Sequence, residues 1–137
     1  MTSAMKAAAK APALTFTTLP AIGTSLSGGT YAGLISQPDG TAVAVVVLPE
    51  RKEDLTWRQA TTWAKKQGGQ LPTRPVAALL FANVKDALAP QWHWTCEESA
   101  WNASCAWGCD FSLGYQYGNL KSYRGSAVAV RLIPITA

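Results

Sequence analysis

Charged side chains are scarce in this sequence. Only 15% of its 137 residues are charged, whereas 48% are hydrophobic, and this balance excludes an intrinsically disordered chain. The net charge is only +4, and the Lys and Arg residues are scattered without a long basic run. A nucleic-acid footprint usually gathers basic residues on one face. We therefore expect no nucleic acid among the partners of this protein.

Long hydrophobic runs are also missing. No stretch reaches the 18 apolar residues of a membrane-spanning helix, so we expect no membrane insertion. The alanine-rich start, MTSAMKAAAKAPALTF, has no apolar block of the length that a secretory signal needs. We therefore expect a protein made in the cytosol, whose three cysteines are thiols and not a disulfide framework.

The length of the chain permits one domain with a single core. Residues 1–29 are predicted to form an extended arm, because they carry Pro12, Pro20 and the flexible GTSLSGG and have no strand partner nearby. The arm either lies on the domain or reaches a neighbouring subunit, and the sequence leaves both options open. Residues 30–137 are predicted to form the folded domain.

Local patterns predict the elements of the first half of that domain. The β-rich runs TYAGLIS and TAVAVVVL are separated by QPDG, which predicts a hairpin. In LTWRQATTWAKKQGG, Thr56 and Gln59 form a capping box for a helix whose Trp63 faces the core. A second helix is predicted over about Pro75 to Leu88, with Thr73 as its N-cap.

The second half of the domain returns to short β runs. These are QWHWTCE, CAWGCDFSL and the closing SAVAVRLIPI, while SLGYQYGNLKSY is rich in Gly, Tyr, Ser and Asn and is predicted to be a loop. The order is hairpin, two helices and then strands, which predicts an α+β fold and not alternating βαβ units. We expect the last strand to pair with the early hairpin.

Several segments resemble a bacterial and bacteriophage family of unknown function. They are LTWRQATTWAKKQGGQLPTRPVAALLFANVKDAL, WHWTCEE, AWGCDFSLGYQYGNLKSY and AVAVRLIP, and the match covers roughly residues 30–135. The resemblance implies a C-type-lectin-like fold, which formylglycine-generating enzymes and the variable proteins of diversity-generating retroelements share. In that fold two helices flank a small mixed or antiparallel sheet with paired termini, and long loops form the ligand face.

Metal binding is not expected. The residues His93, Cys96, Cys105 and Cys109 follow the spacing H-x2-C-x8-C-x3-C, which matches none of the paired knuckles of zinc sites. In a strand, His93 and Cys96 would also point to opposite faces. Calcium needs several oxygen ligands. The loops supply only Glu97, Glu98 and Asp110, and the EPN and WND signatures of calcium-dependent lectins are absent.

Enzymatic activity and a cofactor are not expected either. Cys105 and Cys109 could imitate the reactive cysteine pair that formylglycine-generating enzymes use with copper. This chain is far shorter than those enzymes, however, and lacks their inserted segments. His93 is the only histidine, so the sequence offers little to activate a nucleophile.

Aromatic and small polar side chains remain as candidates for binding. Recognition loops favour Tyr, Trp, Ser, Gly and Asn, and EESAWNASCAW and SLGYQYGNLKSY are built largely from them. Trp92, Trp94 and Trp107 are predicted to be core residues, whereas Trp101 is predicted to be exposed. The candidate ligand- or receptor-binding residues are Ser99, Trp101, Asn102, Ser104, Tyr115, Tyr117, Asn119 and Tyr123.

The resemblance implies a non-enzymatic binding module of a phage or prophage. We expect it to be made in the cytoplasm of the bacterial host and carried on the virion. The favoured function is recognition of a host surface protein or glycan at the tail fibre or tail tip. The alternative is a decoration or assembly subunit of the head or tail, anchored by its N-terminal arm. The low charge favours contacts with other virion subunits and a homo-oligomer. An enzyme of the formylglycine-generating type is the least favoured function.

Overall fold

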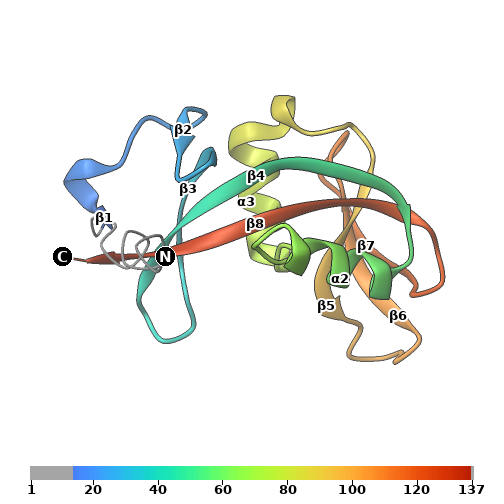
Figure 1. Ribbon diagram of the computed structural model, residues 1–137. Helices are drawn as coiled ribbons and strands as arrows, with labels where there is room; N and C mark the ends of the chain where they lie inside the picture. Colours follow the sequence, from blue (N-terminus) through green and yellow to red (C-terminus); the bar gives the residue numbers. More distant parts are fainter. Residues whose placement is uncertain (1–13, 137) are drawn as a thin grey trace, which may run out of the picture.

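Two long antiparallel strands form the axis of the fold (Figure 1). They are β4 (Ala42–Leu55) and β8 (Gly125–Thr136) of a computed structural model that describes residues 14–136. Six shorter strands complete the sheet: β1 (Leu14–Thr15), β2 (Ser25–Leu26), β3 (Gly29–Ser36), β5 (Trp92–Glu98), β6 (Cys105–Asp110) and β7 (Gln116–Leu120). The helices are α2 (Trp57–Lys66) and α3 (Arg74–Val84), with short 3-10 turns η1 (Phe16–Thr18) and η2 (Lys85–Ala87). No helix in this described range is long and apolar enough to cross a membrane.

The eight-stranded sheet is mostly antiparallel. Its order is β2-β3-β4-β8-β5-β6-β7, and β1 pairs with β8 outside this path. Among the described strands, only the β1–β8 and β5–β8 pairings are parallel. The predicted α+β fold is confirmed, and so is the return of the last strand to the early hairpin, because β8 pairs with β4 from Val43↔Pro134 to Leu55↔Gly125.

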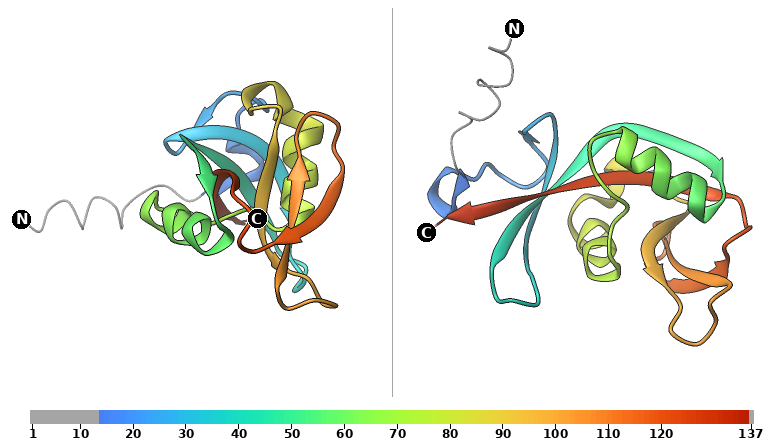
Figure 2. Two further views of the ribbon diagram at one scale, coloured as in Figure 1. Left: turned by 90° about the vertical axis from the view of Figure 1, so that its right-hand side faces the viewer. Right: turned by 60° about the horizontal axis from the view of Figure 1, so that its bottom comes forward.

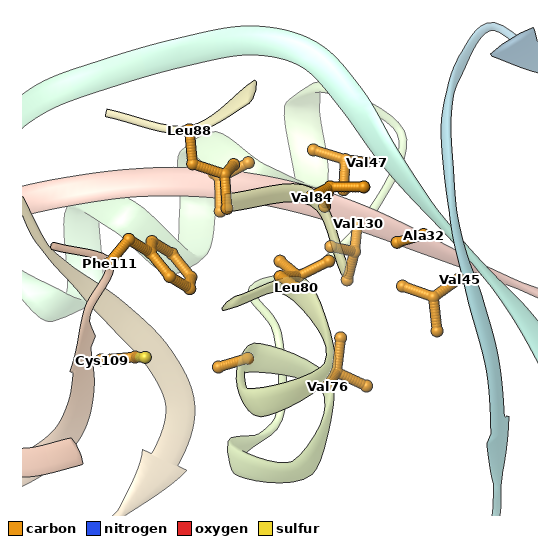
Figure 3. Packing of buried hydrophobic residues seen from close by; sticks show 12 residues of the cluster. Ala32, Val45, Val47, Val76, Leu80, Val84, Leu88, Cys109, Phe111 and Val130 are labelled. Carbon is orange, nitrogen blue, oxygen red and sulfur yellow. The ribbon is translucent and has the colours of Figure 1, made fainter. Parts of the chain in front are cut away.

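The two helices lie on opposite sides of β8 (Figure 2). Successive side chains of a strand alternate between the two faces of a sheet, and β8 follows this rule. Val128 and Val130 pack into the cluster on the α3 side, and Ala127 and Ala129 into the cluster on the α2 side. The α3-side cluster brings together α3, β3, β4, β6 and β8 (Figure 3).

The predicted hairpin and both helix caps are confirmed. β3 and β4 pair antiparallel, and Gly40 takes the left-handed conformation in the turn between them, with φ of 89°. The Thr56 side chain accepts from the Gln59 N–H, and the Gln59 side chain accepts from the Thr56 N–H at 3.0 Å. Thr73 caps α3 by accepting from the Val76 N–H at 3.2 Å.

The end of the second helix was predicted too late. α3 stops at Val84 and is followed by the 3-10 turn η2, so Leu88 is extended and not helical. This turn carries Leu88 into the α3-side cluster, where it is 6% exposed. Packing of Leu88 into the core thus outweighs the helical preference of the local sequence.

The prediction of a loop over SLGYQYGNLKSY was also wrong in part. Residues Gln116–Leu120 form β7, which pairs with β6 from Cys109↔Gln116 to Cys105↔Leu120. Gly and Asn are depleted in strands, but strand propensity depends strongly on what the side chains pack against. Here Tyr117 lies opposite Gly108 and packs on Trp92.

The described part of the predicted arm lies on the domain. β1 pairs with the end of β8, with Leu14 opposite Ile135, and β2 pairs with β3. The partner of β1 comes from the other end of the chain, so no neighbouring segment could reveal it. Residues 1–13 of the predicted arm lie outside the described residues.

The strand tryptophans are core residues to different degrees. Trp94 is 0% and Trp92 8% exposed, as predicted. Trp92 packs closely against two glycines: a Cβ at Gly108 would stand 1.9 Å from its ring and a Cβ at Gly125 2.8 Å from it. Trp107 is only half-buried, and the Arg74 guanidinium lies 3.6 Å from its ring centroid.

Replacement of Gly108 by Ala tests this packing. The added methyl group overlaps the Trp92 ring, so we expect the free energy of unfolding to fall by about 3 kcal/mol. The matched control is Gly118→Ala in β7, where the nearest atom to the new Cβ is the Ala106 carbonyl oxygen at 3.4 Å. The control should stay within about 0.5 kcal/mol of the parent in urea unfolding. Equal losses in the two variants would contradict the packing of Trp92 on Gly108.

Candidate binding surface

The eight predicted binding residues fall on three neighbouring segments. Ser99, Trp101, Asn102 and Ser104 lie at the β5–β6 loop; Tyr115, Tyr117 and Asn119 lie at or in β7; and Tyr123 lies in the turn between β7 and β8. The structure does not join all of them into one patch. It joins Tyr117 and Tyr123 through Trp92.

The β5–β6 loop uses its own polar side chains to hold its shape. The Ser99 hydroxyl accepts from the N–H groups of Trp101 and Asn102, both at 3.2 Å. The Asn102 side chain accepts from the Ser104 N–H at 2.9 Å. Trp101 is left 86% exposed, which confirms the prediction that it is a surface residue. Ser99 and Asn102 therefore present Trp101 and have less capacity to bind a ligand themselves.

Four aromatic rings form what we call the aromatic cluster: Trp92, Trp94, Tyr117 and Tyr123. The Trp92 ring centroid lies 4.5 Å from that of Trp94, 6.0 Å from that of Tyr117 and 5.4 Å from that of Tyr123. These distances are typical of favourable aromatic pairs. Tyr117 is 46% and Tyr123 48% exposed, so the cluster has a buried tryptophan base and a tyrosine surface.

A polar cleft of about 300 Å³ borders the cluster. Its lining residues are Glu53, Asp54, Gln91, Trp92, Tyr123, Arg124, Gly125 and Ser126. The Ser126 hydroxyl donates to the Gln91 side-chain oxygen at 2.7 Å, and Arg124 binds Asp54 at 3.0 Å. Hydrogen-bonding groups of several kinds thus lie beside the aromatic surface.

Two ion pairs flank Tyr123 in the sequence. Lys121 pairs with Glu98 of β5, and Arg124 pairs with Asp54 of β4. Arg124 also donates to the Asp54 carbonyl at 2.9 Å. The turn that carries Tyr123 is therefore tied to the sheet on both of its sides.

Tyr115 borders a different groove. This groove of about 670 Å³ is lined by Arg74, Pro75, Ala78, Glu97, Gly114, Tyr115 and Gln116. Gln116 exchanges two hydrogen bonds with Arg74, at 3.0 and 2.9 Å, and Glu97 accepts from the Arg74 N–H at 2.7 Å. Sequence reasoning missed Arg74 and Gln116 and considered Glu97 only as a calcium ligand, because only the fold brings the start of α3 next to β5 and β7.

A basic groove was also missed. Lys52, Arg58 and Lys66 line a space of about 390 Å³ beside Trp63, between α2 and the end of β4. In the sequence these cations look scattered. The helical spacing of four residues between Arg58, Thr62 and Lys66 places them on one ridge, and this spacing was the signal that could have found the groove.

Two of the cysteines, Cys96 and Cys109, and the histidine are poorly suited to nucleophilic chemistry. Burial raises the pKa of the Cys109 thiol to about 11 and also raises the pKa of Cys96, so both thiols are protonated at neutral pH. His93 is 2% exposed and its Nδ1 lies 2.8 Å from the Gln91 carbonyl oxygen. Within residues 14–136, no three His, Cys, Asp or Glu side chains gather into a group that could hold a metal ion.

No protein-family model matches the chain, and no curated protein matches it.

The buried His93 predicts a pH dependence of stability. Burial lowers its pKa from 6.5 to about 4, so the unfolded chain takes up a proton on acidification well before the folded chain does. The free energy of unfolding should therefore fall as the pH drops from about 6.5 to about 4, by about 3 kcal/mol in total. Urea unfolding across this range measures the loss.

The control is His93→Gln, which removes the titrating ring. Hydrogen bonds from Ser112 and Thr41 lower the pKa values of Asp110 and Asp39 below 3.8, so these carboxylates lose their contribution only at more acidic pH. The variant should show a much shallower slope between pH 6.5 and 4. The same slope in both proteins would contradict the assignment to His93.

Proposed function

We propose that this chain is a non-enzymatic binding module with a C-type-lectin-like fold, carried on a phage or prophage virion. It recognises a protein or glycan on the host surface without a metal or other cofactor. The observation that carries the proposal is the aromatic cluster, in which two half-exposed tyrosines rest on buried Trp92 beside a polar cleft.

The rigidity of the cluster supports recognition. Tyrosine offers a large amphipathic contact area and loses little conformational entropy on binding. Tyr117 is held by the β6–β7 ladder and Tyr123 by the flanking ion pairs, so both rings are largely pre-positioned. Pre-positioned side chains lower the entropic cost of association.

The polar cleft supports a ligand that carries hydroxyl or amide groups. Arg124 and Asp54 supply a donor and an acceptor, and Gln91 and Ser126 supply an amide and a hydroxyl. Binding sites commonly combine apolar and aromatic surface with a few polar groups that fix orientation. Host glycans and loop peptides both present this mixture.

The state of the thiols supports a non-enzymatic role. A nucleophilic cysteine needs a lowered pKa or an adjacent base. Cys109 and Cys96 have raised pKa values, and His93 is buried and hydrogen-bonded to a backbone carbonyl. Cys96, Cys109 and His93 therefore behave as packed residues and not as an activated nucleophile with its base.

The second candidate is a decoration or assembly subunit of the virion. The observation that favours it is the outer edge of β7, which pairs with no strand in the described part of the chain.

Antibody-gold electron microscopy of particles from the strain that carries the gene separates the two functions. Label at the tail tip supports host recognition, label over the capsid or tail shaft supports decoration, and no label on any particle contradicts both.

The double variant Tyr117→Ala/Tyr123→Ala tests the aromatic cluster. We expect at least about a 30-fold loss of binding of the labelled protein to host cells, because central aromatic residues commonly dominate recognition. The matched control is Tyr115→Ala, which removes a more exposed tyrosine, at 66%, that has no ring contact with the cluster. Flow cytometry measures binding, and circular dichroism checks folding.

Loss of binding in Trp101→Ala alone would instead assign recognition to the β5–β6 loop. Unchanged binding in the double variant would refute the aromatic cluster as the receptor site.

A further inference from the structure

The outer edge of β7 is an open strand edge. β7 is last in the strand order, and within residues 14–136 its only strand partner is β6 (Figure 1). At the opposite end of the order, β2 is only two residues long. β7 has five residues, and its pairing with β6 shows no register shift.

This edge lacks the usual features that prevent pairing with another chain. Natural edge strands carry charges, proline or bulges, or are very short. The residues of β7, QYGNL, include no charge and no proline. Tyr117 and Leu120 are 46% and 56% exposed beside it. The edge is therefore chemically suited to accept another strand.

Gly118 at the centre of β7 is not required by the fold of one chain. Its backbone is not in the left-handed region, and a Cβ there would meet only the Ala106 carbonyl oxygen, at 3.4 Å. A glycine in a strand interior weakens the strand and often marks the close approach of another backbone.

We propose that β7 pairs antiparallel with β7 of a second copy of this chain, about a two-fold axis at Gly118. In this register Gly118 faces its own copy, Tyr117 faces Asn119, and Gln116 faces Leu120. Lys121 faces Tyr115, and its charge is already paired with Glu98 of its own subunit. No like charges oppose each other, so the strand is self-complementary, as an isologous interface requires.

The pairing has a consequence for recognition. Residues directly opposite in a ladder share a face of the sheet, so Tyr117 and the partner's Asn119 lie on the same face. The two aromatic clusters then point to the same side of one continuous sheet, and the dimer can bind two sites on a host surface at once. This bivalence rests on the proposed function, whereas the dimer itself does not.

Charge variants at the self-opposed position test the dimer. The proposal expects the parent protein to sediment as a dimer. Gly118→Lys and Gly118→Glu each place two like charges against each other across the axis. We expect each to raise the dissociation constant of the dimer by about 30-fold or more in analytical ultracentrifugation. An equimolar mixture of the two variants should restore dimers, because opposite charges then face each other.

The matched controls are Thr62→Lys and Thr62→Glu, at an exposed position of α2 away from the edge. Both should remain dimeric. A parent protein that stays monomeric, position-118 variants that stay dimeric, or a mixture that fails to restore the dimer would each overturn the proposal. Circular dichroism of the variants shows whether they fold.

A second measurement uses Gly118→Cys. Opposed residues of an antiparallel pair lie about 4.5–5.5 Å apart at Cα, within the range that a disulfide spans. Mild oxidation should give a covalent dimer on a non-reducing gel, and the parent, which keeps Cys96, Cys105 and Cys109, should not. Absence of the cross-link in a folded variant would count against the axis at Gly118.

The outcomes for the two proposals are separable. A dimer that does not bind host cells would retain the β7 interface and contradict host recognition. A monomer that binds host cells would retain host recognition and contradict the β7 interface.

Discussion

The pairing of β4 with β8 is the constraint on which the rest of this structure depends. The two strands run side by side from Val43↔Pro134 to Leu55↔Gly125 and place alternate residues of β8 on the two sides of the sheet. The α3 side receives Val128 and Val130, and the α2 side receives only Ala127 and Ala129. The small alanines leave room on that side for bulky Trp92 and Trp94, so the size pattern of one strand decides where the aromatic residues can be buried.

The geometry of the proposed binding surface depends on that core. Trp92 can pack this closely against the sheet only because Gly108 and Gly125 have no Cβ, and it contacts both Tyr117 and Tyr123. Its indole Nε1 is the one buried side-chain polar atom of the described residues without a hydrogen-bond partner. An unpaired buried donor costs free energy. The tight packing of the ring therefore outweighs a lost hydrogen bond.

The sequence predicted what local physics decides. The turn at Gly40 and the caps at Thr56 and Thr73 depend on residues a few positions apart, and all three were found. β1 could not be found in this way, because its partner β8 lies at the other end of the chain. β7 lies only a few residues after its partner β6, but Gly and Asn are depleted in strands and so favoured a loop there. Composition alone marked the tyrosines and Trp101 as surface residues. Only the fold shows that Tyr117 and Tyr123 share Trp92, whereas Tyr115 borders another groove.

The scarcity of charge also acquires a physical meaning. Exposed ion pairs usually contribute less than about 1 kcal/mol to stability, so the pairs Lys121–Glu98 and Arg124–Asp54 cannot hold the domain together. One pair nevertheless precedes Tyr123 in the sequence and the other follows it, and together they connect its turn to β5 and β4. Their effect is on position more than on stability. The few charges near the aromatic cluster thus fix the position of Tyr123, which we propose as a recognition residue. The neighbouring edge of β7 has no charge and is left open for the proposed pairing with a second copy of the chain.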